Sequence, residues 1–189
     1  MDTRSPTART VATERRAMTD TAAIQDQLRE LLDGERGLKE LLGANPDWLP
    51  VLIRQLELAV GDHRIIYLGA AIASGLSTVT LRVGIFTDHT VVAAEVVDDS
   101  TPGAQVVTRV ESRAGLLRFE LSGGTENDNS NESSWQGGFR VRAFYRSGLV
   151  VTVPANIVDT EAKRVSVHAV LDGIRADLQA HPPSSVQDD

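Results

Sequence analysis

The chain has 189 residues, no cysteine and a formal net charge of −7. The length predicts one globular domain, and the lack of cysteine excludes disulfide frameworks and thiolate metal sites. The negative charge argues against a general nucleic-acid binder, whose surface is normally basic. No apolar stretch is long enough to span a bilayer, so we expect a soluble protein.

Both ends of the chain are predicted to be disordered. Residues 1–20 are mostly Thr, Arg, Ala and Ser, and residues 182–189 begin with two prolines and two serines, so neither end has much to bury. Residues 1–20 also lack the apolar run of a secretory signal, which favours a cytoplasmic protein. Either Met1 or Met18 can be the first residue of the native chain.

Residues 21–59 are predicted to form a helical segment with two helices. The first runs over 21–33 with Asp20 as its N-cap, and the second runs from Asp47, its predicted N-cap, through Ala59. The apolar positions at helical spacing are Ile24, Leu28, Leu31 and Leu32 in the first helix and Leu49, Leu52, Ile53, Leu56 and Ala59 in the second. Pro50 falls in the first turn, where its missing N–H has no cost. Together with Trp48, the second stripe packs either on the sheet or against a second chain, so a homodimer stays open.

From Arg64 onward the apolar period changes from 3.6 to 2, which predicts β-strands. Seven strands are expected: Arg64–Gly69, Leu76–Phe86, Thr90–Val97, Gln105–Ser112, Leu116–Leu121, Gly138–Arg146 and Leu149–Val153. The predicted inward side chains are Val79, Leu81, Val83 and Ile85 in the second strand, Leu117, Phe119 and Leu121 in the fifth, and Phe139, Val141 and Ala143 in the sixth.

Short polar connections between the strands predict antiparallel hairpins. They are Thr87-Asp88-His89, Arg113-Ala114-Gly115 and Ser147-Gly148, whereas residues 122–137 form a long polar loop. A last helix is predicted over Thr160–Ala180, capped by Asp159 or Thr160, with one apolar stripe made by Val167, Leu171, Ile174 and Leu178. The fold class is therefore α+β: two helices, then seven antiparallel strands and a C-terminal helix over residues 60–181, closed as a barrel or a curled sheet.

This order of elements resembles the pleckstrin-homology-like (PH-like) fold of bacterial proteins. Leu81–Val92 is similar to the second and third strands of that family, and Val106–Glu120 is similar to the fourth and fifth. The resemblance covers about residues 60–180. It implies a barrel capped by a helix and a tendency to bind peptides or membranes, but no activity. The loop Ala70–Ser77 has no basic residue, whereas lipid-binding members carry Lys or Arg there.

The sequence shows no pattern that predicts catalysis, a metal or a cofactor. Asp88 beside His89 has the residue types of an acid–base pair, but both lie in a predicted hairpin turn, where Asp is common for conformational reasons. Asp98 and Asp99 lack the spacing of a calcium loop. We therefore expect a protein that is not an enzyme, and an enzyme that uses Asp88 and His89 is one alternative.

One candidate binding feature lies on the sixth strand. Arg140, Arg142, Phe144 and Arg146 alternate along it and are expected to share its outer face. Such a stripe suits an acidic peptide or a lipid head group, and the competing interpretation is cross-strand pairing with Glu120, Glu111 and Glu95. The sequence thus favours a non-enzymatic module that binds an unidentified protein or peptide, with peptide addition to a strand edge as one mode. A peripheral adaptor on anionic lipid is the other alternative.

Overall fold

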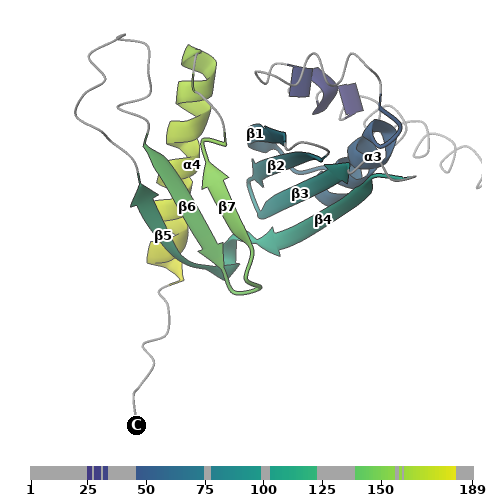
Figure 1. The fold of residues 1–189 in the computed structure, drawn as a ribbon. Coiled ribbons are helices and arrows are strands. Elements are labelled where there is room, and N and C mark those ends of the chain that lie inside the picture. The colour runs from purple at the N-terminus through teal and green to yellow at the C-terminus, as the bar shows by residue number, and fades with distance from the viewer. Residues whose placement is uncertain are drawn as a thin grey trace, which may run out of the picture.

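The computed structural model describes residues 25, 26, 28–30, 32, 33, 46–74, 78–98, 103–122, 139–155, 158 and 160–181. In this part of the chain the fold is α+β, with two antiparallel sheets and a long C-terminal helix (Figure 1). The predicted disordered ends and residues 123–137 of the predicted polar loop lie outside the described residues.

Seven strands are present, and their bounds match the prediction in part: the predicted loop Ala70–Ser77 is wrong as far as Ser74, because β1 continues to that residue. In chain order they are β1 (Ile65–Ser74), β2 (Val79–Thr87), β3 (Thr90–Asp98), β4 (Gln105–Ser112), β5 (Leu116–Ser122), β6 (Arg140–Tyr145) and β7 (Val150–Val153). β1 to β4 form a four-stranded sheet in sequence order, and β5 to β7 form a three-stranded sheet. The expected closed barrel or single curled sheet is therefore wrong, because the described strands divide into two sheets.

The division occurs at Arg113-Ala114-Gly115, where a hairpin turn was predicted. These residues form instead a short 3-10 helix, η1 (Arg113–Gly115), capped by Ser112, whose hydroxyl accepts from the N–H of Ala114. The N–H of Arg113 donates to the carbonyl of His89, in the β2–β3 turn, at 3.0 Å. This bond extends the β3–β4 pairing by one residue, and β5 starts a new sheet directly after η1.

A helix, α3 (Leu49–Val60), covers one face of the four-stranded sheet (Figure 1). Its buried apolar side chains share a core with β1, β2 and β3, so the face that was predicted to cover the sheet or a second chain packs on the sheet. Asp47 does not cap the helix: the N-cap position is Trp48, which is itself buried, and Pro50 lies in the first turn as predicted. The helix therefore begins at a buried aromatic residue, without a hydrogen bond from a side-chain cap.

The described residues between 25 and 33 are helical, as predicted. Leu28 and Leu32 are fully buried in the same core as α3, whereas the predicted cap Asp20 and the apolar residues Ile24 and Leu31 lie outside the described residues. The amide of Gln25 donates to a carboxylate oxygen of Glu57 at 2.7 Å. Glu57 also accepts from Arg54, at 2.9 and 3.0 Å, so this buried carboxylate is well satisfied.

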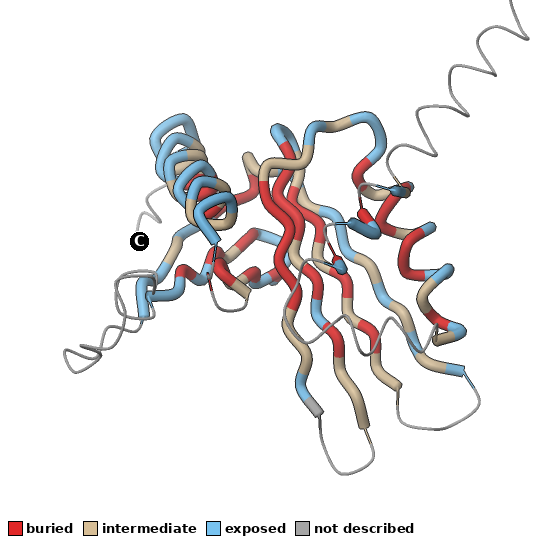
Figure 2. The backbone as a smooth tube through the Cα atoms, turned by 90° about the horizontal axis from the view of Figure 1, so that it is seen from above, coloured by how far each residue is buried: buried red, intermediate tan, exposed pale blue. Residues whose placement is uncertain are grey.

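The C-terminal helix, α4 (Glu161–Ala180), builds the second core. Thr160 caps it as predicted, with its hydroxyl accepting from the N–H of Lys163 at 3.2 Å. Figure 2 shows buried residues, in red, in both sheets and in both helices. The members of this core come from both sheets and from α4: Tyr67, Phe86, Val91, Leu116, Val141, Ala143, Tyr145, Leu149, Val151, Val153, Val158, Val167, Val170 and Ile174. A Cβ on Gly84 would lie 3.0 Å from Val151, so β2 and β7 are in close contact.

Five of the ten inward predictions in these strands are confirmed, and three are wrong. Leu81, Val83 and Ile85 are buried, as are Val141 and Ala143, but Leu117, Phe139 and Leu121 are exposed. The other two, Val79 and Phe119, are partly buried. An irregular register between Leu116 and Arg118 puts Leu116 into the core instead of Leu117. Leu121 and Phe139 are exposed because both lie at one end of the three-stranded sheet. Leu121 also lies on β5, an edge strand of that sheet.

A buried ion pair ties α4 to the first sheet. The Nε of Arg113 donates to a carboxylate oxygen of Asp177 at 2.8 Å, and its Nη1 donates to the carbonyl of Thr87 at 3.1 Å. The side chains of Arg113 and Asp177 are only 13% and 19% exposed. Gly173 leaves room for the guanidinium, which a Cβ there would overlap. Burial and the nearby Asp177 carboxylate raise the pKa of Tyr145.

Replacement of Arg113 by alanine is expected to lower the free energy of unfolding by about 3 kcal/mol, because the Asp177 carboxylate would stay buried without its partner. Chemical denaturation measures this loss. The matched control is Arg175→Ala on α4, whose pair with Asp172 is exposed and whose loss is expected to cost less than about 0.5 kcal/mol. Equal losses in the two variants would contradict the structural role of Arg113.

Glu57 predicts a specific dependence of stability on acid. Hydrogen bonds from Gln25 and Arg54 hold the pKa of Glu57 below its usual 4.5, against the effect of burial. The pKa of Glu57 is thus lower in the folded state than in the unfolded state. The carboxylate therefore contributes fully to the free energy of unfolding above about pH 4.5, and this contribution is lost as the pH falls through the folded-state pKa. In Glu57→Gln the unfolding free energy should therefore fall less steeply between about pH 5 and pH 3 than in the wild type. A slope that is the same in Glu57→Gln and in the wild type would contradict this role of the carboxylate.

Candidate binding sites

The outer face of the three-stranded sheet, on the side away from the core, carries arginine and phenylalanine. The register of β5 and β6 places Arg118 opposite Phe144, Glu120 opposite Arg142 and Ser122 opposite Arg140. Partners in a register point to the same side of a sheet, so one face displays Arg118, Arg140, Arg142 and Phe144. We call these four residues, with the carboxylate of Glu120, the arginine face.

Two guanidinium groups of this face stack on one ring. The Cζ of Arg118 lies 4.4 Å from the Phe144 ring centroid, and the Cζ of Arg142 lies 5.1 Å from it, both within cation–π range. Both also approach Glu120, Arg118 at 3.1 Å and Arg142 at 3.9 Å. Ring and carboxylate together orient the two cations on a rigid strand pair while leaving them exposed.

The structure places three of the four residues of the predicted stripe on one face of the sheet. Arg140, Arg142 and Phe144 share the face, whereas Arg146 lies in the turn after β6, where its N–H donates to the carbonyl of Gly115. Arg118 was missed. Arg118 lies opposite Phe144 because of the register in which β5 and β6 pair. The alternation of residues within either strand does not predict this register.

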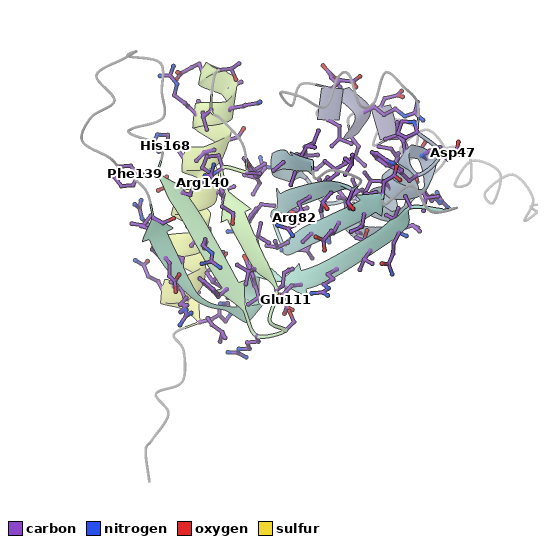
Figure 3. All side chains as sticks on the ribbon, viewed as in Figure 1. Asp47, Arg82, Glu111, Phe139, Arg140 and His168 are labelled. Carbon is purple, nitrogen blue, oxygen red and sulfur yellow. The ribbon has the colours of Figure 1, made fainter. Side chains whose placement is uncertain are left out.

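The competing interpretation, cross-strand pairing with three glutamates, holds for one of them. Glu120 pairs with Arg142, whereas Glu95 pairs with Arg82 at 2.9 Å within the four-stranded sheet, and Glu111 lies on β4. Figure 3 shows Arg140 on the three-stranded sheet and both Arg82 and Glu111 on the other. Three arginines against one glutamate leave an excess of two positive charges on the arginine face, and exposed pairs of this kind contribute little to stability.

A second cluster joins the start of β1 to the β2–β3 turn. The Nδ1 of His63 lies 3.5 Å from one carboxylate oxygen of Asp88, and the Nε2 of His89 lies 3.9 Å from the other. The two imidazole rings stand edge to face with their centroids 5.1 Å apart. One potential ligand atom from each residue lies within 4.8 Å of the other two. We call these three residues the histidine cluster.

Strand register explains why these residues meet. Ile65 pairs with Thr87 at the end of β1 and β2, so the residues just before Ile65 face those just after Thr87. His63 reaches this position because Gly61, with φ of 59°, ends α3 and turns the chain toward β1. Asp88 and His89 follow from the hairpin turn that the sequence predicts.

The turn itself is firmly held. Thr87 is fully buried, and its hydroxyl oxygen accepts from the N–H groups of His89 and Thr90 at 3.2 and 2.8 Å. Arg113 bonds both the Thr87 and the His89 carbonyls. The assignment of Asp88 and His89 to a hairpin turn is thus confirmed. No pattern in the sequence associates His63 with them, since the three residues converge only through the β1–β2 register.

The comparisons with known proteins gave no match: no family model, no curated protein and no solved structure is similar to this chain. Among the described residues, no helix has the length and apolar character needed to cross a bilayer.

Proposed function

We propose that this chain is a non-enzymatic protein-interaction module with a PH-like order of strands and C-terminal helix, and that its arginine face binds an acidic segment of a partner protein. The observation that carries the proposal is the pair of exposed guanidinium groups, Arg118 and Arg142, stacked on Phe144. Arginine and aromatic side chains are the residue types enriched at protein interfaces.

The charge of the face favours an acidic partner. The whole chain carries −7, but the arginine face carries three arginines and one glutamate. A carboxylate within about 8 Å of this face feels mainly the local positive charge, because salt screens the more distant acidic groups. An extended anionic membrane would also meet the acidic remainder of the chain, so a small acidic segment fits better than a lipid surface.

The arrangement of the arginines favours bidentate contacts. A guanidinium presents five N–H donors in a plane, and a carboxylate accepts two of them at once. Stacking on Phe144 and contact with Glu120 reduce the rotamer freedom of Arg118 and Arg142 before a partner binds, so less conformational entropy is lost on binding.

The edges of the three-stranded sheet suggest how such a segment lies. Among the described strands, β5 and β7 each pair only with β6, so each has an edge without a paired strand in this part of the chain. An extended segment that added to one of these edges would point alternate side chains toward the arginine face. A strand with acidic residues at every second position is therefore the proposed ligand.

The proposal predicts saturable binding of a fluorescein-labelled ten-residue peptide that alternates glutamate and valine, measured by fluorescence anisotropy. The double variant Arg118→Gln/Arg142→Gln should weaken binding about tenfold, equivalent to about 1.4 kcal/mol for two charge-assisted contacts. A peptide that alternates lysine and valine should not bind, and added salt should weaken the acidic complex.

The matched control is Arg82→Gln/Arg175→Gln, which removes the same charge from exposed sites outside the arginine face. It should retain wild-type affinity for the acidic peptide within about twofold. Equal affinities of the two double variants would overturn the proposal. So would peptide binding that is absent while vesicles containing phosphatidylserine bind the wild type and not the arginine-face variant, because that result assigns the face to a membrane.

A further inference from the structure

We infer that the histidine cluster, His63, Asp88 and His89, is a surface binding site for a divalent transition-metal ion, with Zn²⁺ as its expected occupant. Two imidazole nitrogens and one carboxylate oxygen form a donor set that Zn²⁺ accepts, with further positions open to water or to a partner's side chain. The site is independent of the arginine face, with which it shares no residue.

The distances are close to those that a metal would impose. Ligand atoms about 2.0–2.2 Å from a tetrahedral Zn²⁺ lie about 3.3 Å from one another. The His63 nitrogen and the nearer Asp88 oxygen are already 3.5 Å apart, and all three ligand atoms fall within 4.8 Å. To reach the same ion, the imidazole of His89 has to move closer to the other two ligands. Its side chain is 71% exposed and can therefore rotate without disturbing the core.

The backbone that carries the ligands is held in place without a metal. Thr87 and Arg113 together make four hydrogen bonds to the turn: the Thr87 hydroxyl oxygen accepts two, the N–H of Arg113 donates to His89, and its guanidinium donates to Thr87. On the other side, the N–H of His63 donates to the carbonyl of Val60 at 3.2 Å. A metal would thus bind ligands on two tethered segments, which lowers the entropy lost on binding.

The chemistry of the donors separates transition metals from the hard cations. Mg²⁺ and Ca²⁺ prefer oxygen ligands, and this cluster supplies one carboxylate with two imidazoles. Zn²⁺, Co²⁺ and Ni²⁺ accept imidazole nitrogen readily. The partial exposure of His63 and Asp88, at 37% and 40%, gives the ion a direct path from solvent.

Titration calorimetry tests the site with ZnCl₂ and the full chain, prepared without a polyhistidine tag and freed of metal with a chelator. We expect one equivalent to bind, and His63→Ala and His89→Ala each to weaken the affinity at least about tenfold. Asp88→Asn should weaken it as well, and MgCl₂ should not bind. His181→Ala, which removes an exposed histidine at the end of α4, is the matched control and should bind as the wild type does.

Two further readouts separate metal binding from a purely structural role of the cluster. Zn²⁺ should raise the unfolding temperature of the wild type and of His181→Ala, but not of His63→Ala/His89→Ala, because binding to the folded state alone stabilises it. Co²⁺ should give the visible absorption of a low-coordinate nitrogen and oxygen site in the wild type and lose it in the double variant. Zn²⁺ affinity that is the same in the wild type and in the double variant, or absent in both, would overturn the inference.

Discussion

The guanidinium of Arg113 joins segments of the chain that the sequence keeps far apart. It contacts Asp177 on α4 and the carbonyl of Thr87 at the end of β2, and its own backbone N–H bonds His89 in the same turn. All of these contacts are made from η1, the point at which one sheet ends and the other begins. Because the ion pair is largely buried, loss of either partner would leave a charge in the interior, and this makes the junction intolerant of rearrangement.

Packing around this junction determines the shape of the molecule. Gly173 admits the Arg113 side chain against α4, and Gly84 admits Val151 against β2. Two glycines thus allow the helix and the second sheet to approach the first sheet closely, and Tyr67, Phe86 and Val91 of the first sheet enter the core of the second. The strands divide into two sheets at η1, but the core beneath α4 contains residues of both sheets.

The histidine cluster belongs to the part of the chain before η1, and the arginine face belongs to the part after it. The histidine cluster is on the turn that Arg113 holds directly, so its geometry depends on the ion pair. The arginine face lies on the strand pair that begins just after η1, and its stacked cations depend on the β5–β6 register. The contacts of Arg113 thus hold the turn of one site and lie where the sheet that carries the other begins, and the ligands proposed for the two sites belong to different chemical classes.

The sequence by itself determined the elements of this protein, because alternation and helical spacing report which side of a strand or helix is buried. It predicted the seven strands, the turn at Asp88, the Thr160 cap and the inward stripe of α4. The tertiary structure alone decided which strands are neighbours and in what register. That decision replaced the expected barrel by two sheets, brought Arg118 onto the ring of Phe144, and placed His63 beside Asp88 and His89. Periodicity cannot contain this information, because register arises from contacts between residues that are distant in the chain.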